Sequence, residues 1–145
     1  MARIIPLADA RNVEKKSDAT PDELEFIHVN KTAAMIEAAL VMGGLIGGAN
    51  EENLAALRRA GRHLGLAFQI IDDILDATAD TATLGKTAGK DAKAGKTTFV
   101  KLHGTEASGR IAREQTEAAF AALQALPGNT TFLNRLMDAL VHRTK

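Results

Sequence analysis

The feature that most constrains this chain is a segment whose side chains sort onto two faces at helical spacing. At about 100° per residue, the polar positions share an arc of about 100°. They are Gly65, Gln69, Asp72, Asp73 and Asp76. The opposite arc is apolar, with Leu64, Ala67, Phe68, Ile70, Ile71, Ile74 and Leu75. The segment therefore predicts a helix with one face in a core and the other face acidic.

Helix signals dominate the rest of the 145 residues. Thr20 and Glu23 form a capping-box pattern, and Asn50 precedes two acidic residues that suit a helix start. No turn dipeptide separates alternating apolar runs, so strands are not expected. The expected helices run over about 20–43, 50–77, 98–102, 106–126 and 130–142, with a loop at 78–96. The chain is predicted to be an all-α helical bundle over 21–145, with 1–20 as a loose lead-in.

Composition excludes several classes of function. Eighteen basic residues balance eighteen acidic ones, and aromatic residues are 3% of the chain, so neither a basic nucleic-acid surface nor a base-stacking platform is expected. Cysteine is absent, which excludes disulfides and thiolate chemistry. The longest apolar stretch, Ala38–Ala49, is shorter than the roughly 20 residues that cross a bilayer. Without a secretory pattern at its start, the protein is expected to be cytoplasmic and not transmembrane.

The acidic face has two interpretations. Carboxylates three and four residues apart on a helix repel one another, and no Lys or Arg lies between Gly65 and Asp76. A solvent-facing acidic stripe is one interpretation. The other is a Mg²⁺ site, because Mg²⁺ binds one or two carboxylates together with substrate phosphates.

The loop after this face is rich in cations. Its lysines are Lys86, Lys90, Lys93 and Lys96, spaced by three glycines. Flexible backbone with ammonium groups suits an oligophosphate, although a solvated loop would look the same. Lys31 and Thr32, in the middle of the first expected helix, are a second candidate for an anion, with a snorkelling lysine as the alternative. The four histidines have no metal-ligand spacing.

Together these segments resemble the trans-type isoprenyl diphosphate synthases, the farnesyl and geranylgeranyl diphosphate synthase family. Residues 68–76 resemble its second aspartate-rich motif, 84–98 its lysine-bearing stretch and 24–32 its Lys-Thr helix. The resemblance implies a Mg²⁺-dependent prenyltransferase, usually a homodimer, that condenses an allylic diphosphate with isopentenyl diphosphate. It implies that Asp72 ligates Mg²⁺, with Asp73, Asp76 and Asp91 nearby, directly or through water. It also implies that the allylic diphosphate is held by Lys31, Thr32, Gln69, Lys86 and Lys96.

The resemblance covers only the C-terminal half of such an enzyme. No paired-aspartate motif precedes Lys31, where the family has its first one. The chain is therefore expected to bind Mg²⁺-diphosphate, but to be incomplete for turnover unless a second copy or a missing N-terminal half joins it. The alternative is a non-catalytic or regulatory partner subunit of a heteromeric synthase. Apolar surface that a missing half would cover predicts that the isolated chain associates.

Overall fold

The computed structural model describes residues 20–82 and 97–143. Over these two ranges the secondary structure is helical and contains no strand, which confirms the all-α prediction. The elements are α2 (Pro21–His28), the π-helical turn η1 (Val29–Ala33), α3 (Ala34–Ile46), α4 (Glu51–Ala82), α6 (Phe99–His103), α7 (Thr105–Gln124) and α8 (Thr131–Val141). Of the predicted lead-in 1–20, residues 1–19 lie outside the described residues, and Thr20 is the N-cap of α2.

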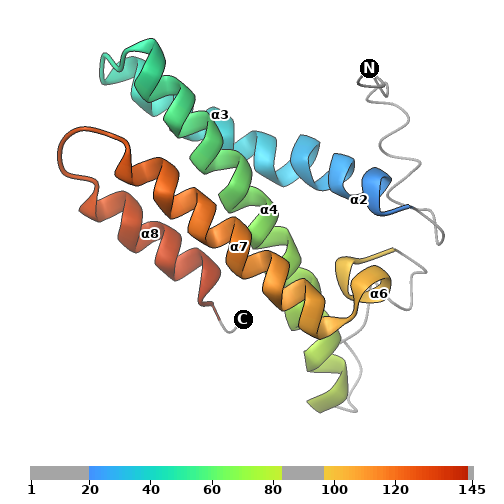
Figure 1. Ribbon diagram of the computed structural model, residues 1–145. Coiled ribbons are helices and arrows are strands. Elements are labelled where there is room, and N and C mark those ends of the chain that lie inside the picture. Colours follow the sequence, from blue (N-terminus) through green and yellow to red (C-terminus); the bar gives the residue numbers. More distant parts are fainter. Residues whose placement is uncertain (1–19, 83–96, 144–145) are drawn as a thin grey trace.

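Helix α4 is the axis of the bundle. Figure 1 shows α2, η1 and α3 as one rod on one side of α4, and the antiparallel pair α7 and α8 on the other. The short helix α6 lies near the C-terminal part of α4. Every other described helix packs against α4, so residues on different arcs of α4 meet different segments of the chain.

Two helices begin at the caps that the sequence predicts, and a third begins at a cap that it does not predict. Thr20 and Glu23 form both bonds of the capping box, and the Asn50 side chain accepts a hydrogen bond from the backbone of Asn53 at 2.9 Å. The Thr98 hydroxyl accepts from the backbone of Lys101 and caps α6. Two helices run further than expected: the first continues through Gly43 and Gly44 to Ile46, and α4 reaches Ala82 rather than about Ala77.

The first rod contains an irregularity that its sequence pattern did not predict. Buried residues in α2 follow ordinary helical spacing at Leu24, Ile27 and His28, but the next one is Ala33, five residues further on. A step of five is the spacing of a π turn, and η1 supplies that turn. The turn absorbs the extra residue, so Ala33 lies on the same side of the rod as the buried residues of α2.

Two glycines of α4 fix how closely this rod approaches. A Cβ atom at Gly61 would lie 2.8 Å from the backbone nitrogen of Glu37, and one at Gly65 would lie 2.9 Å from that of Ala33. The rod therefore packs backbone to backbone against a notch formed by Gly61 and Gly65. Gly65, which the sequence analysis placed on the polar arc, is part of this packing.

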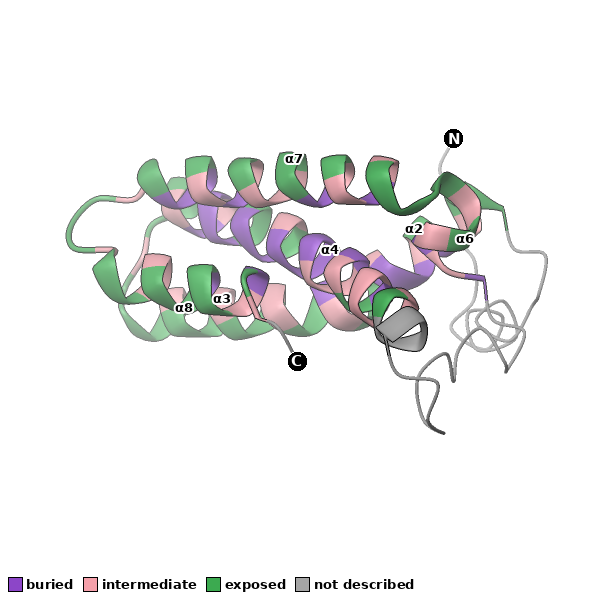
Figure 2. Cartoon of the chain, turned by 90° about the horizontal axis from the view of Figure 1, so that it is seen from below, coloured by how far each residue is buried: buried purple, intermediate pink, exposed green. Residues whose placement is uncertain are grey.

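The core lies along α4. Figure 2 shows buried residues as a strip on α4 and on the side of α7 turned toward it. One cluster joins α4, α7 and α8 around Ala60, Leu64 and Leu123. A second, smaller cluster joins α2, α4, α6 and α7 around Ile70 and Phe99. The second cluster supports the end of α4 that carries the acidic residues.

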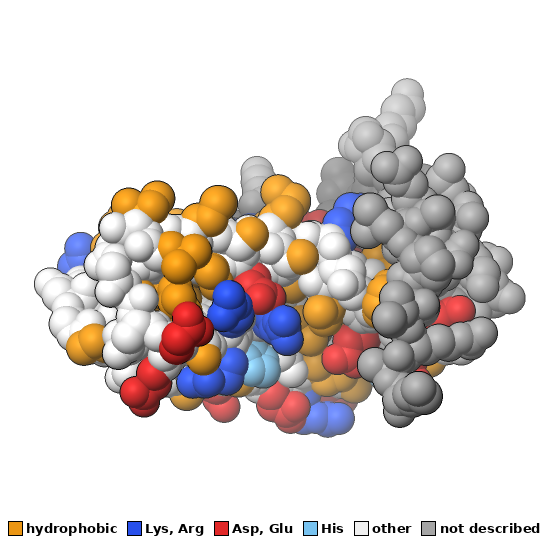
Figure 3. All heavy atoms as spheres, turned by 90° about the horizontal axis from the view of Figure 1, so that it is seen from above, with side chains coloured by type: hydrophobic (Ala, Val, Ile, Leu, Met, Phe, Trp, Pro, Cys, Tyr) orange, Lys and Arg blue, Asp and Glu red, His pale blue; other side chains and the backbone are white. Residues whose placement is uncertain are grey.

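Helix α3 is the most apolar described element and contains no buried residue. Four of its large apolar side chains are exposed, from 58% to 90% of their surface: Met35, Met42, Leu45 and Ile46. On the face drawn in Figure 3, hydrophobic side chains gather beside a band of mixed acidic and basic groups. By length and composition, the helical run 21–46 is apolar enough to cross a membrane, with a mean hydropathy of 1.3 over an 18-residue window within it.

A charged group in that run has a protein partner. Glu37 accepts a hydrogen bond from Arg62 of α4 at 2.7 Å, and this bond and the Glu37 charge raise the pKa of Arg62 above its usual value. An ion pair and a glycine notch on the same helix are typical of packing within a bundle. The absence of a membrane span stays a prediction.

Candidate functional site

A line of hydrogen bonds joins three of the segments that the sequence analysis singled out. The Thr32 hydroxyl of η1 donates to Gln69 Oε1 of α4 at 3.3 Å. Gln69 Nε2 donates to Asp73 Oδ1 at 3.4 Å, and the backbone N–H of Phe99 donates to Asp73 Oδ2 at 2.9 Å. The Lys-Thr segment, the acidic helix and the helix that follows the lysine-rich loop thus meet at one place.

Asp73 is the inner member of the aspartate pair. Its residue is 7% exposed, and both carboxylate oxygens accept the bonds described above. A buried carboxylate needs such donors, because an unpaired charge in a core is costly. Asp73 therefore joins α6 to α4 and orients Gln69. This placement suits an acidic residue that acts on a bound cation through its neighbours or through water.

Lys31 and Thr32 lie within the π turn. Lys31 is exposed and Thr32 is half-buried against α4. A regular helix would direct residues 31 and 32 differently, because one extra residue in a turn changes the angular position of those around it. The turn thus leaves the lysine at the surface and the threonine beside Gln69. Isolated π turns in α-helices are frequent at functional sites.

Asp72 points away from Asp73, toward the end of α8. Its side chain is 60% exposed, and its Oδ1 atom forms an ion pair with Arg143 at 3.0 Å. Asp76 lies one turn further along α4 and is half-buried. Asp72 and Asp76 share a helix face, since residues four apart are neighbours.

These carboxylates suit a hard divalent cation. Within the described ranges no three acidic or histidine side chains converge in a ready-made metal cage. Mg²⁺ does not need one, because it retains waters and uses one or two carboxylates with substrate phosphates. Asp72 and Asp76 place two carboxylates on one face of α4, and Asp73 lies directly beside Asp72 in sequence. The donor set therefore fits Mg²⁺ completed by a diphosphate.

The remaining predicted site residues lie outside the described part of the chain. These are Lys86, Asp91 and Lys96. The residues that follow them are described: Thr97 is buried and Thr98 caps α6. The bond between Phe99 and Asp73 brings this end of the lysine-rich segment to the acidic face.

Three parts of this arrangement were not predicted from the sequence: the Phe99 N–H, Arg143 and the glycine pair of α4. The backbone N–H of Phe99 carries no side-chain signal. Arg143 meets α4 across a sequence separation of 71 residues, so no local pattern predicts its partner. Gly61 and Gly65, four residues apart, were recognisable as a small-residue spacing that lets helix backbones approach.

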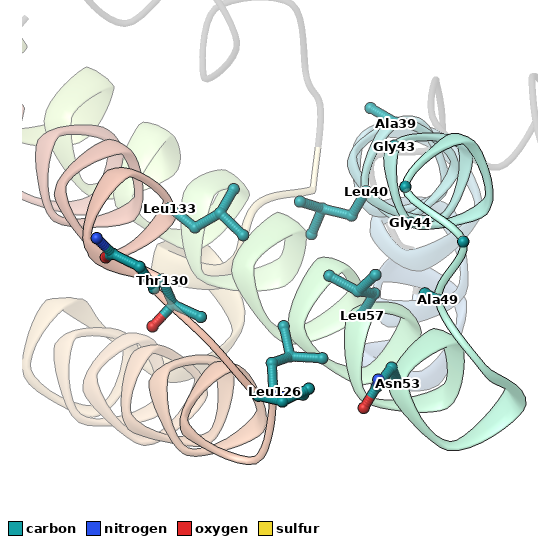
Figure 4. A pocket seen from close by; sticks show the side chains of 14 residues that line it. Ala39, Leu40, Gly43, Gly44, Ala49, Asn53, Leu57, Leu126, Thr130 and Leu133 are labelled. Carbon is teal, nitrogen blue, oxygen red and sulfur yellow. The ribbon is translucent and has the colours of Figure 1, made fainter.

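A separate pocket lies at the other end of the bundle. Its volume is about 530 Å³, and no charged side chain lines it. Leu40, Leu57, Leu126 and Leu133 point toward one another across it from different segments (Figure 4). Leu57 precedes Asp72 by 15 residues on α4, or about 22 Å at the helical rise of 1.5 Å. This pocket is therefore not part of the acidic site.

Comparison with known proteins gives the family. A polyprenyl synthetase family model matches residues 7–129. The chain belongs to the polyprenyl synthetase family, as the motifs predicted.

Curated relatives carry prenyl diphosphate synthase names. The chain is 46% identical over 125 residues to a chloroplastic geranylfarnesyl diphosphate synthase of Leucosceptrum canum, covering 86% of this chain and 34% of that protein. It is 52% identical over 103 residues to the chloroplastic geranylgeranyl pyrophosphate synthase 11 of Arabidopsis thaliana, covering 70% and 29%. The chain thus spans about a third of the length of these relatives.

Solved structures share the fold. A decaprenyl diphosphate synthase of Rhodobacter capsulatus matches 95% of this chain and 56% of its own, with a TM-score of 0.82 and 29% identity. A geranyltransferase of Helicobacter pylori, in complex with magnesium and isoprenyl diphosphate, matches 93% and 45%, with a TM-score of 0.70 and 31% identity. The described helices therefore have the isoprenoid synthase fold.

The predicted cytoplasmic location is wrong by the same comparisons. Relatives in plants are named chloroplastic, and one from Arabidopsis thaliana is named mitochondrial, which points to an organelle. The prediction rested on the first residues of this chain, which spans about a third of the length of these relatives. The start of such a segment does not show to which compartment the whole protein is targeted.

Proposed function

We propose that this chain supplies the Mg²⁺-dependent, allylic-diphosphate-binding part of a prenyl diphosphate synthase. In the reaction, the C–O bond of the allylic diphosphate breaks and the diphosphate leaves with the electron pair. The double bond of isopentenyl diphosphate forms the new C–C bond, and a proton is then lost. The products are a longer prenyl diphosphate and inorganic diphosphate.

One observation carries this proposal: the bonded line from Thr32 through Gln69 and Asp73 to Phe99. It unites a lysine-bearing turn, an acidic helix face and the end of a lysine-rich segment. A leaving diphosphate gains negative charge, so fixed cations and donors stabilise its departure. The names of relatives and of structural neighbours support the same chemistry.

Each residue has a proposed role. Mg²⁺, when bound, would stabilise the negative charge of the leaving group. Asp72 and Asp76 would hold it, with Asp73 and Asp91 acting directly or through water. Lys31, Lys86 and Lys96 would bind diphosphate oxygens through their ammonium groups, and Thr32 and Gln69 would do so as neutral donors.

Association is part of the proposal. The exposed apolar side chains of α3 form a surface that suits another protein layer. We expect a second copy, or a polypeptide equivalent to the rest of the longer relatives, to cover it. The alternative of a non-catalytic partner subunit gains no support from the comparisons.

Calorimetry tests the binding half of the proposal. The chain is titrated with inorganic pyrophosphate in the presence of Mg²⁺ and again with EDTA. We expect binding that requires Mg²⁺ and is lost in an Asp72→Asn, Asp76→Asn double variant. Binding that is equal in EDTA would contradict the proposed metal site.

A radiochemical assay tests turnover. Labelled isopentenyl diphosphate and geranyl diphosphate are incubated with the chain and Mg²⁺, and prenyl products are extracted. We expect binding without turnover for the chain alone, and product when a complementing N-terminal half is added. If Asp72→Ala and Asp73→Ala leave the activity of that assembly unchanged, this chain is a scaffold.

A further inference from the structure

Arg143 is held in one orientation by four groups. Its Nη1 donates to the carbonyl of Leu140 at 2.7 Å, and its Nη2 donates to the carbonyl of Phe68 at 3.1 Å. The same Nη2 donates to Asp72 Oδ1 at 3.0 Å. The guanidinium carbon lies 3.6 Å from the centre of the Phe68 ring. The Arg143 side chain is only 16% exposed, so this guanidinium is a rigid donor rather than a surface group.

Asp72, in contrast to Arg143, is largely exposed to solvent. Its side chain is 60% exposed, and Oδ1 is the oxygen that Arg143 engages. Among the described residues, Oδ2 has no hydrogen bond or ion pair with protein. A carboxylate fixed through one oxygen keeps its plane, and its other oxygen remains accessible from solvent.

We propose that Arg143 is a positioning residue that orients Asp72 as a metal ligand. The inference rests on the proposed function, since it takes Asp72 as a ligand of Mg²⁺. Carboxylates that bind metals are commonly held by hydrogen bonds from residues behind them, and loss of such a partner lowers metal affinity about 10- to 100-fold. Arg143 provides this support from the end of α8, so the docking of α8 and the metal site depend on one contact.

The electrostatic cost of placing Arg143 near a bound cation is small. The guanidinium and a cation on Oδ2 would repel each other, but the exposure of Asp72 lets water and salt screen that repulsion. Lysine cannot replace Arg143, because one ammonium cannot stack on a ring and serve three acceptors in a plane. The geometry therefore requires arginine.

The test compares Mg²⁺ affinity among variants. The unaltered chain, Arg143→Met and Arg143→Lys are titrated with Mg²⁺ in a calorimeter at fixed inorganic pyrophosphate. We expect Arg143→Met to weaken Mg²⁺ binding about 10- to 100-fold and Arg143→Lys to restore little of it. Arg135→Met, at an exposed arginine of α8, is the matched control and is expected to leave the affinity unchanged.

A second measurement does not depend on variants of Arg143. In a sample labelled with ¹⁵N-arginine, the hydrogen-bonded guanidinium of Arg143 should give slowly exchanging N–H signals that change in Asp72→Asn. We expect these signals to persist when Mg²⁺ and pyrophosphate are added. Their disappearance on Mg²⁺ binding would show that the metal displaces Arg143, and would overturn the proposal.

The remaining outcomes are also decisive. Equal or tighter Mg²⁺ binding by Arg143→Met overturns the positioning role alone. Weaker pyrophosphate binding by Arg143→Met at Mg²⁺ concentrations that saturate both proteins would mean that Arg143 contacts the diphosphate itself, which also overturns it. If the unaltered chain binds no Mg²⁺ under these conditions, the proposed function fails and the role of Arg143 fails with it.

Discussion

The backbone of Ala33 lies against Gly65, with no room between them for a side-chain carbon. A Cβ atom at Gly65 would lie 2.6 Å from the Cβ atom of Ala33. Ala33 ends the π turn that carries Lys31 and Thr32, so this contact sets the position of that turn along α4. Four residues after Gly65, Gln69 then faces Thr32. The geometry of the site therefore begins with a packing contact that involves no functional group.

Gly65→Ala should destabilise the protein. The added methyl must displace the Ala33 backbone, and overpacking of this kind costs about 1–3 kcal/mol. The effect should appear as a lower midpoint in urea unfolding and as weaker binding of Mg²⁺-pyrophosphate. Gly43→Ala is the matched control, because a Cβ atom there meets nothing within 4 Å. Because Gly43 lies within helix α3, Gly43→Ala should raise the free energy of unfolding by about 0.5–1 kcal/mol. If Gly43→Ala lowered it as much as Gly65→Ala, close packing at Gly65 would not be the cause of the destabilisation.

Asp73→Ala should loosen α6. The change leaves the buried N–H of Phe99 without its acceptor, at a cost of about 1–3 kcal/mol. Hydrogen exchange at Phe99 should accelerate, and the unfolding free energy from urea titration should fall. Asp76→Ala, at a half-buried position on the same helix, is the comparison for stability, and an equal loss there would argue against a special role for Asp73.

Thr32→Val should separate binding from stability. The hydroxyl contributes one long bond to Gln69, so the unfolding free energy should fall by about 0.5–1.5 kcal/mol. Pyrophosphate affinity should fall more, because Gln69 loses its orientation and the site loses a donor. Thr116→Val removes a hydroxyl that bonds within α7, and should change stability without changing affinity. Equal pyrophosphate affinities of the two variants would show that the Thr32 hydroxyl does not contribute to diphosphate binding.

Ile46→Lys should reduce self-association without loss of stability. Ile46 is 90% exposed at the end of α3, so the change removes apolar surface and disturbs no core contact. Light scattering should report a smaller mean mass at equal protein concentration, and urea unfolding should be unchanged within about 0.5 kcal/mol. An unchanged mass would mean that the chain associates through another surface, or that it does not associate.

The sequence was sufficient for those parts of the structure that depend on local spacing. Capping at Thr20 and Asn50 and the apolar periodicity of 64–75 predicted helices that the structure contains, because caps and periodicity act within a few residues. The wheel also placed Gln69 and Asp73 on one arc of the helix, and the structure shows them hydrogen-bonded to each other.

The parts that could not be predicted depend on distant segments. Asp72 and Asp73 have similar sequence environments, yet one pairs with Arg143 near the end of α8 and the other is buried under Phe99. Which neighbour an aspartate meets depends on how α6 and α8 dock on α4. The burial of Gly65 likewise depends on the rod of α2, η1 and α3, since a wheel assigns an angle to a residue but not the segment that covers it.

The π turn also determines which changes in length this segment can accept. Core positions advance by three or four residues within α2 and by five from His28 to Ala33. Deleting one residue between 29 and 32 would leave His28 and Ala33 four residues apart, which is regular α-helical spacing, so both would still lie on the side of the rod that faces α4. Inserting one residue there would instead rotate α2 by about 100° relative to α3, and Leu24 and Ile27 would turn away from α4. In this stretch, an insertion should therefore damage the core far more than a one-residue deletion.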